Sequence, residues 1–388
     1  MTRQSAGRRS LLAGLLAAAA ALPAGAKTPA PTTRPAGKPA GLAAQARALA
    51  QARLRELGQG YVAQIDDRRH VVYISAVGKK NLLVVMKLLA AHSDVQRGLL
   101  FARPLQWNVT VILPTLRHYR KLAPSAKAAG YYHAPTRTLQ SISFSDVLVH
   151  EFIHALHHND MALAGQRHPI WLAEGLATLF QRSQFRKGKL EVLESQGLRE
   201  LQKAVKENRA ASLARLTAMN PKQFHAQAEL HYRQVRYVMM YLHRRGKLKA
   251  YYEAFKANYA QDRTGAATLA KLLGRELHQI DAEWRKWVLG LRPPWRPAYE
   301  LRAHLGVRMK PTPEGVQVTG FVRGTPAAKA RLLKVDDVIL SVSGQPTPTP
   351  RELTEAVQSC RPGNVVDIEV IREGRTIVVK HLLGLMPK

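Results

Sequence analysis

The sequence has a single cysteine, Cys360, among 388 residues. One cysteine excludes an intramolecular disulfide, so the folded state must be stabilised by its buried core. It also excludes a metal site built from several thiolates. Any metal site must therefore use histidine and carboxylate side chains.

Acidic residues are scarce, with 27 Asp and Glu against 59 Lys and Arg, and the formal net charge is +32. The first 26 residues carry three arginines and no acidic residue, which leaves 32 − 3 = +29 for the rest of the chain. This excess favours acidic partners or an anionic envelope surface. The basic residues are spread from Arg47 to Lys388, and no zinc-finger, RRM or helix-turn-helix pattern accompanies them, so nucleic acid is not an expected partner.

Long hydrophobic runs are lacking except near the start of the chain. Arg3, Arg8 and Arg9 precede the apolar run Leu11–Leu22, and Ala24-Gly25-Ala26 follows it, which is the layout of an export signal. The run is too short for a typical membrane span, so we expect no transmembrane span in the mature chain. The paired arginines fit a twin-arginine signal, and an ordinary Sec signal is an equal alternative. Either predicts an exported protein, periplasmic or secreted.

An HExxH motif is present at His150-Glu151-Phe152-Ile153-His154. Asp146–His158 is predicted to be helical, and residues four apart on a helix share a face, so His150 and His154 can direct two imidazoles at one metal ion. Glu151 would lie beside the metal as the general base. A catalytic zinc has three protein ligands and a fourth position for water, whose pKa it lowers toward neutrality. The motif therefore predicts Zn²⁺ as the cofactor.

The third ligand is predicted to be Glu174, twenty residues after His154. It lies in an apolar run with helical spacing, where an unpaired buried carboxylate would be costly and a zinc ion would be a suitable partner. Asp160, six residues after His154, is the alternative, at the position where metzincins place their third ligand. Those enzymes need a glycine at the intervening turn, where this chain has His157, and this favours Glu174.

HExxH followed by W-L-x-E-G-x-A at Trp171–Ala177 resembles the gluzincin metallopeptidases, which include thermolysin-like enzymes and zinc aminopeptidases. The resemblance implies that His150, His154 and Glu174 bind zinc and that Glu151 is the base. It covers these two motifs strongly and the flanking sequence only loosely. No G-A-M-E-N motif precedes HExxH, which argues against the aminopeptidases that carry it. Endopeptidase and exopeptidase activity both stay open.

Two further roles follow from the same resemblance. Residues 130–139 are predicted to form a hairpin-like strand region before the active-site helix, and gluzincins use such an edge to bind substrate backbone by strand addition. After Glu174 the pattern predicts helices to about Leu289. Gluzincins take a Tyr or His from this later region to stabilise the oxyanion, which makes Tyr232 or His231 the candidate, with a packing role as the alternative.

Beyond the proline-rich segment Arg292–Pro297 the pattern changes to short strands. The succession Leu305-Gly306-Val307, Gly324–Ala330 and Asp336–Gly344 resembles a PDZ domain of the HtrA type. The resemblance implies that backbone amides near Leu305, Gly306 and Val307 receive a peptide carboxylate while the peptide adds as a strand. The helix at Pro350–Ser359 would form the other wall of the groove.

The PDZ-like segment departs from its family at one loop. The family pattern A-G-L-x-x-G-D has two glycines, which Arg331 and Val335 replace here, so we expect the geometry of this loop to differ.

The predicted fold class is α+β: a zincin-like metallopeptidase domain with a small mixed sheet, an active-site helix and a mainly helical second half, then a β-rich PDZ domain. The predicted function is an exported zinc peptidase whose PDZ domain binds the C-termini of substrates or partners. The alternative is a non-catalytic cell-envelope adaptor that uses the PDZ domain and the basic surface. The predicted segments are a signal peptide at 1–26, a disordered linker at 27–41, the metallopeptidase domain at 42–290, a proline-rich linker at 291–300 and the PDZ domain at 301–384.

Overall fold

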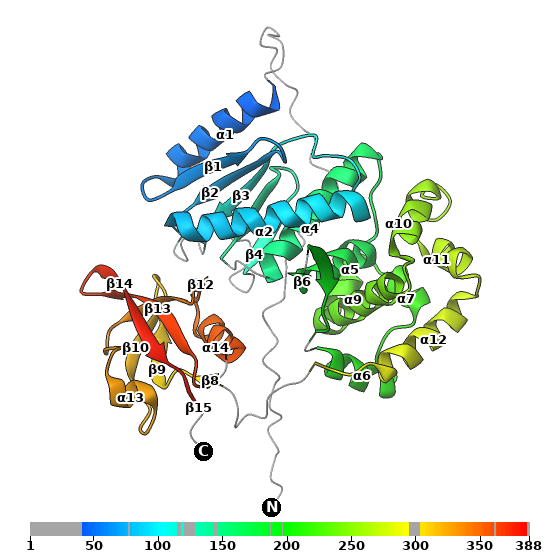
Figure 1. Cartoon of the computed structure of the whole chain (residues 1–388). Coiled ribbons are helices and arrows are strands. Elements are labelled where there is room, and N and C mark those ends of the chain that lie inside the picture. The colour runs from blue at the N-terminus through cyan, green and yellow to red at the C-terminus, as the bar shows by residue number, and fades with distance from the viewer. Residues whose placement is uncertain are drawn as a thin grey trace, which may run out of the picture.

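The computed structural model describes residues 41–76, 78–114, 118–119, 129–142, 146–186, 188–195, 197–294, 303–360 and 362–385. The predicted signal peptide and nearly all of the predicted first linker lie outside these residues, as does most of the second linker. Up to residue 294 the chain is a mixture of helices and strands, and from residue 303 it is rich in strands (Figure 1). The predicted α+β class is confirmed at this level.

The elements up to residue 294 include most of those expected from the sequence. In chain order they are α1 Leu42–Leu57, β1 Val62–Asp66, β2 Val71–Ser75, α2 Gly78–Leu99, β3 Val109–Leu113, β4 Gly130–His133, β5 Thr138–Ser141, α4 Asp146–Leu163, α5 Ile170–Gln181, β6 Ser183–Arg186, β7 Lys189–Val192, α6 Leu198–Lys206, α7 Leu213–Thr217, α8 Pro221–Ala226, α9 Ala228–Arg244, α10 Leu248–Ala257, α11 Ala266–Leu273 and α12 Leu277–Gly290.

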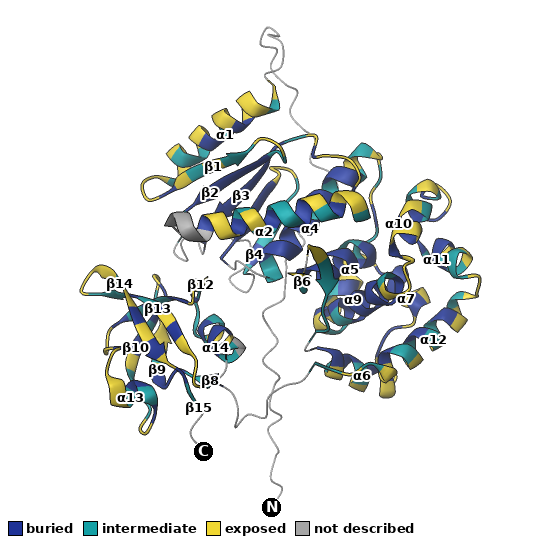
Figure 2. Ribbon diagram, viewed as in Figure 1, coloured by how far each residue is buried: buried dark blue, intermediate teal, exposed yellow. Residues whose placement is uncertain are grey.

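Five strands form a mixed sheet in the order β1-β2-β3-β5-β4. β2, β3 and β5 run parallel to their neighbours in that series, whereas β1 and β4 pair antiparallel at the two edges. Successive side chains of β2 point to opposite faces of the sheet. Val71 and Tyr73 join the large core with α2 and α4, while Val72 and Ile74 pack in a smaller core under α1. Because both faces are covered, every residue of β2 is buried (Figure 2).

Helix α5 packs against both α4 and α9, and α4 packs against β4 and β5 of the sheet. Gly175 lets α5 and α9 approach closely, because a Cβ at this position would lie 2.8 Å from Met239 Cγ and 3.4 Å from the Val235 carbonyl oxygen. Nearly every residue of α5 is buried, so the polar side chains on it lie inside the protein (Figure 2). α5 therefore presents Glu174 within the core.

The expectation of helices throughout the region after Glu174 is wrong at β6 and β7, which form an antiparallel hairpin. Helix α5 ends at Gln181, and the Ser183 hydroxyl donates a hydrogen bond of 2.6 Å to the Phe180 carbonyl oxygen. A side chain that occupies a helix carbonyl in this way competes with helix continuation. Phe185, on the hairpin, packs edge-on against His92 of α2.

The C-terminal part contains a sheet with its own core. Its elements are β8 Ala303–His304, β9 Val307–Pro311, β10 Val316–Phe321, α13 Pro326–Ala330, β11 Val338–Val342, β12 Gln345–Pro346, α14 Pro350–Ser359, β13 Val365–Arg372, β14 Arg375–Leu382 and β15 Gly384–Leu385. The sheet order is β14-β13-β11-β10-β9, with β12 paired to β11. Among the described strands, β9 and β14 are therefore the two edges of this path.

No described helix combines the length and the apolar character that a membrane-spanning segment needs.

Candidate metal centre and PDZ domain

Helix α4 carries the HExxH motif on a buried surface. Leu148, Phe152 and Ala155 of this helix are fully buried in the main core, which fixes the rotation of the helix against the sheet and α5. His150 is buried and His154, one turn later, is partly exposed. The rings of the two histidines lie edge to face with their centroids 4.7 Å apart.

Helix α5 brings the Glu174 carboxylate to both histidines. The His150 Nε2 and His154 Nε2 atoms are 3.0 Å apart, and Glu174 Oε2 lies 3.3 Å and 3.4 Å from them. Burial acts to raise the pKa of Glu174, but His154 and His150 together outweigh it through their charges and their side-chain contacts, and the pKa is lowered. The structure thus brings together the three side chains that the sequence predicted as ligands.

The residues present fit a zinc ion. Ligand atoms about 2.0–2.1 Å from a tetrahedral zinc are separated from one another by roughly 3.3 Å, close to the three distances found here. Glu174 Oε2 is buried and has no hydrogen-bond partner among the described residues. Two imidazoles and a carboxylate are also the donor set of a common class of catalytic zinc sites. In the part of the chain that the structure describes, this is the one group of His, Cys, Asp or Glu side chains arranged to hold a metal ion.

Glu151 lies next to this triangle and is almost fully buried. Burial raises the pKa of Glu151, and the charges of His150 and His154 oppose this effect. The backbone N–H of Tyr132 in β4 donates a hydrogen bond to the Glu151 carboxylate, whereas Glu151 Oε1 has no hydrogen-bond partner among the described residues. A buried carboxylate with one unpartnered oxygen and a raised pKa is suited to accept and return a proton.

Of the two candidates for the oxyanion, the structure brings only Tyr232 to the triangle. Its hydroxyl donates a hydrogen bond to Glu174, and its ring centroid lies 6.4 Å from that of His150. Burial raises the pKa of Tyr232 well above the usual value, so its hydroxyl stays protonated and can donate. The neighbouring His231 uses Nδ1 in a hydrogen bond of 2.7 Å with the Phe224 carbonyl oxygen, which holds its ring away from the triangle.

Asp160, the alternative third ligand, lies elsewhere. Its carboxylate accepts hydrogen bonds from the Tyr252 hydroxyl at 2.7 Å and from Lys256 Nζ at 2.6 Å. His157 hydrogen-bonds to His168 at 2.7 Å, and both rings are buried. These buried polar side chains therefore have hydrogen-bond partners of their own, and none of those partners is one of the three predicted ligands.

Two polar residues that the sequence analysis did not single out support the triangle. His150 Nδ1 donates a hydrogen bond of 2.7 Å to the Gln181 side-chain oxygen, and both groups are buried. With its proton on Nδ1, His150 has the Nε2 lone pair directed at the triangle. Gln181 lies seven residues after Glu174, which is two helical turns and therefore the same face of α5. That spacing was the signal by which the sequence could have identified it.

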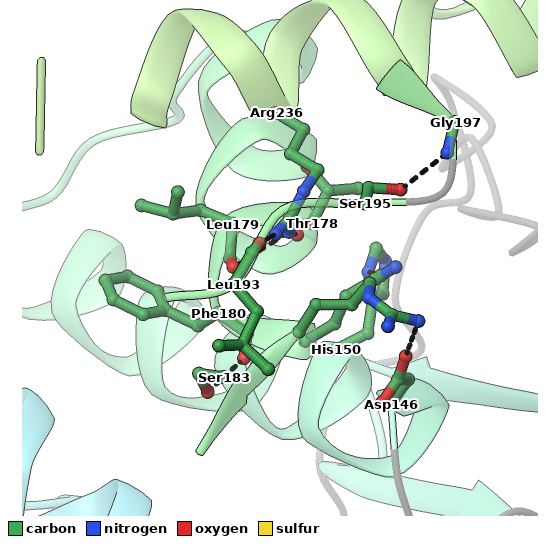
Figure 3. A network of polar contacts seen from close by, with 12 residues as sticks. Asp146, His150, Thr178, Leu179, Phe180, Ser183, Leu193, Ser195, Gly197 and Arg236 are labelled. Atoms are coloured by element: carbon green, nitrogen blue, oxygen red, sulfur yellow. Dashed lines mark hydrogen bonds and ion pairs between the residues drawn. The ribbon is translucent and has the colours of Figure 1, made fainter. Parts of the chain in front are cut away.

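Arg236 is the second such residue, and its guanidinium is buried at the C-terminal end of α5. It donates to the carbonyl oxygens of Thr178, Leu179 and Leu193 (Figure 3). A cation at this position satisfies helix-terminal carbonyls and interacts favourably with the helix dipole. Arg236 is four residues after Tyr232 on α9, so one helix holds both the end of α5 and the candidate oxyanion donor.

The predicted strand region at 130–139 forms the hairpin of β4 and β5, and β4 is the edge strand nearest α4. One side of β4 pairs with β5, and no described strand pairs with the other side. An open strand edge can bind an extended peptide by adding it as a further strand. Tyr132 links this edge to Glu151 through its backbone, which places a candidate peptide-binding edge beside the candidate base.

The predicted carboxylate-binding segment Leu305-Gly306-Val307 leads directly into β9, an edge strand of the C-terminal sheet. Gly306 has φ of +85°, and a Cβ there would lie 2.4 Å from Thr325 Oγ1. Thr325 in turn caps the N-terminus of α13. α14 packs against β8 and β9, so a helix lies along the open edge as the prediction required.

The loop after α13 differs from the expectation in one position. Arg331 is left-handed, with φ of +51°, and so keeps the conformation of the glycine that it replaces. The second left-handed residue is Asp336, with φ of +72°, rather than Val335. The next residue, Asp337, is buried and forms an ion pair with Arg372 at 2.7 Å. The loop therefore contains two left-handed residues, although it has neither of the two glycines of the family pattern.

The comparisons with known proteins concern the C-terminal part. Residues 303–381 match the family described as PDZ domain. A DegP-like periplasmic serine endoprotease from Pseudomonas fulva is 37% identical over 75 residues, 19% of this chain and 15% of that protein. A structure of a single-substitution variant of the HtrA-type protease AlgW with a decapeptide is 34% identical with a TM-score of 0.21, and the alignment covers 22% of this chain and 30% of that chain. This chain thus spans less than a third of either relative.

An aminopeptidase N family protein from Idiomarina loihiensis aligns with more of the chain, covering 84% of it and 67% of its own length. The identity is 11% and the TM-score is 0.32, too low to assign a fold. The zincin-like fold and the zinc ligands therefore stay predictions. What the family match and the sequence identity show is that residues 303–381 form a PDZ domain similar to those of HtrA-type periplasmic proteases.

Proposed function

We propose that this protein is an exported zinc-dependent peptidase that hydrolyses peptide bonds, with His150, His154 and Glu174 as the metal ligands. The observation that carries the proposal is the buried triangle of their three donor atoms beside the unpartnered oxygen of Glu151. A structural site would not need a buried base at that place. The proposed gluzincin type adds a zincin-like fold for the first domain.

Zinc held by these three residues would lower the pKa of a water molecule and polarise the carbonyl of the bond to be cleaved. Glu151 takes the proton from the attacking water and returns it to the leaving amine. Its buried position and raised pKa suit both steps. The Tyr232 hydroxyl donates a hydrogen bond to the oxygen on which negative charge develops, in place of the bond that it makes to Glu174.

The substrate backbone would add to the open edge of β4, beside Glu151. The PDZ domain would bind a peptide C-terminus at Leu305, Gly306 and Val307 and so recruit the substrate or a partner. The similarity to periplasmic proteases agrees with the export signal predicted from the sequence. The alternative, a non-catalytic envelope adaptor, rests on the PDZ domain as the part whose family is shown.

The deciding experiment compares wild-type protein with Glu151→Gln in a peptide-library cleavage assay, with the zinc content of both measured in parallel. We expect the variant to keep its zinc and to lose cleavage by roughly 100-fold to 10,000-fold, because the amide cannot accept the proton. Glu253→Gln, at an exposed position of α10, is the matched control and should cleave like wild type. If Glu151→Gln cleaves as fast as wild type, Glu151 is not the base. If the wild type binds zinc but cleaves no peptide, the adaptor function is favoured.

A further inference from the structure

The loop between α13 and β11 of the PDZ domain exposes large apolar side chains. Leu332 is 49% exposed and Val335 is 50% exposed. A shallow surface hollow beside them is lined by Phe321, Ala328, Arg331, Leu333, Lys334 and Val335. We call Phe321, Ala328, Leu332 and Val335, together with the basic residues Lys329, Arg331 and Lys334, the α13–β11 surface.

Hydrogen bonds and an ion pair hold this loop in the conformation that exposes the apolar side chains. The buried Asp337 accepts a hydrogen bond of 2.7 Å from the Lys334 backbone N–H, and both of its carboxylate oxygens accept hydrogen bonds from the Arg372 guanidinium. Arg372 also donates to the Leu332 carbonyl oxygen at 2.8 Å. The polar contacts that hold the loop therefore lie beneath it, and Leu332 and Val335 project from it.

The same surface carries unbalanced positive charge. Lys329, Arg331 and Lys334 are exposed, and none of them has an ion pair with a described residue. The nearby acidic residue Asp336 is exposed and accepts a hydrogen bond from Gln317. Three cations around two projecting aliphatic side chains match a layer that is anionic at its surface and apolar beneath it.

We propose that the α13–β11 surface binds the PDZ domain to an anionic phospholipid membrane surface. Leu332 and Val335 insert at the boundary between headgroups and acyl chains, and the three basic side chains contact lipid phosphates. The high net charge of the chain draws it toward such a surface. An acidic protein would match the charges but would not require the two aliphatic side chains to project.

This surface leaves the peptide groove accessible. The groove lies between β9 and α14, whereas α13 packs against β14. Figure 1 shows α13 and α14 on different sides of the PDZ strands. A domain bound to the membrane through the α13–β11 surface can therefore bind a peptide at the same time.

The test is co-sedimentation of the full chain with vesicles of phosphatidylcholine, with or without about one third phosphatidylglycerol. We expect binding to the anionic vesicles, weakened by salt, and little binding to phosphatidylcholine alone. The triple variant Lys329→Gln, Arg331→Gly and Lys334→Gln should bind on the order of 100-fold more weakly, because each basic residue near an anionic surface contributes roughly fivefold. Glycine is chosen at position 331 because it suits the left-handed backbone there.

Two further variants separate this surface from the general charge. Leu332→Ser with Val335→Ser keeps all charges and should also weaken binding, which a purely electrostatic contact or an acidic partner site would not predict. The matched control removes three exposed lysines of the first domain, Lys222→Gln, Lys271→Gln and Lys286→Gln, and should bind nearly as wild type. The proposal is overturned if wild type does not bind anionic vesicles, if the control loses as much as the triple variant, or if the serine variant binds unchanged.

Discussion

The candidate metal centre and the PDZ domain present their functional groups in opposite ways. In the first domain the groups are side chains, and His150, Glu151 and Glu174 are all buried and positioned by other buried polar groups. In the PDZ domain the proposed groups are backbone amides at an open strand edge, beside the left-handed Gly306. Substitutions in the first domain should therefore act through donor chemistry, and those in the second through backbone conformation.

The comparison also explains what could be predicted from the sequence. Side-chain chemistry leaves a local signal in the sequence. The four-residue spacing of His150 and His154, with an acidic residue in a later apolar run, was enough to predict that these three side chains lie together. Backbone recognition leaves no such signal. The PDZ domain was predicted because its whole pattern of strands and turns resembles a family, and the family match bears this out.

The features that escaped prediction depend on tertiary contacts. Arg236 looks like an ordinary surface cation in the sequence, and only the packing of α9 against α5 shows it buried on helix carbonyls. The hairpin of β6 and β7 is short, and Ser183 ends the preceding helix through a hydrogen bond that spacing does not reveal. Asp336 rather than Val335 is left-handed, and it precedes the buried Asp337, whose ion pair with Arg372 is a tertiary contact that no local pattern reveals.

Gln181→Leu is expected to have the largest effect on one region alone, because it should weaken zinc binding and leave the PDZ domain unchanged. The substitution removes the acceptor for His150 Nδ1 while nearly keeping the side-chain volume. We expect zinc affinity to fall by about 10-fold to 100-fold, as is typical for partners of metal-bound histidines, with PDZ peptide binding unchanged. The measurement is competition for zinc against a chelator of known affinity.

Two variants control for this effect. Gln181→Glu keeps an acceptor and should retain most of the affinity for zinc, whereas Gln184→Leu makes the same change at an exposed position of β6 and should have no effect. If Gln181→Leu binds zinc like the wild type, Gln181 does not orient His150, and the three-ligand proposal stands unaffected. If the wild type itself binds no zinc, the ligand proposal is the one that fails.

The corresponding change in the PDZ domain is Gly306→Ala. The new Cβ would lie 2.4 Å from Thr325 Oγ1, in a backbone conformation that disfavours an L side chain. We expect the domain to lose about 1–3 kcal/mol of stability and much of its peptide affinity, with zinc binding unchanged. Hydrogen exchange of the PDZ strands in the full chain and titration with a C-terminal peptide library measure the two effects.

Gly320→Ala is the matched control, because the nearest atom to a Cβ at position 320 is Arg308 Cδ at 3.8 Å. It should change exchange and peptide affinity little. Equal effects of the two substitutions would contradict the special role assigned to the conformation of Gly306.

The smallest expected effect is a gain in stability from Arg331→Gly. Arg331 has φ of +51°, and the left-handed conformation costs a residue with a Cβ about 1 kcal/mol. Slower hydrogen exchange in the PDZ strands would show the gain. Arg323→Gly removes the same side chain where the backbone is not left-handed and should destabilise slightly through chain entropy. Destabilisation by both substitutions would mean that the Arg331 side chain stabilises the loop by more than the strain costs.

The proposed function depends most on the proposed three-ligand metal centre, and the most direct test is the zinc content of the purified full chain. Protein is loaded with excess zinc, dialysed against metal-free buffer and measured by elemental mass spectrometry. We predict about one zinc per chain for wild type, and little for Glu174→Gln, which keeps the shape of the side chain and removes its charge. Retention of zinc by Glu174→Gln at the wild-type level, or its absence from wild type, would contradict the account.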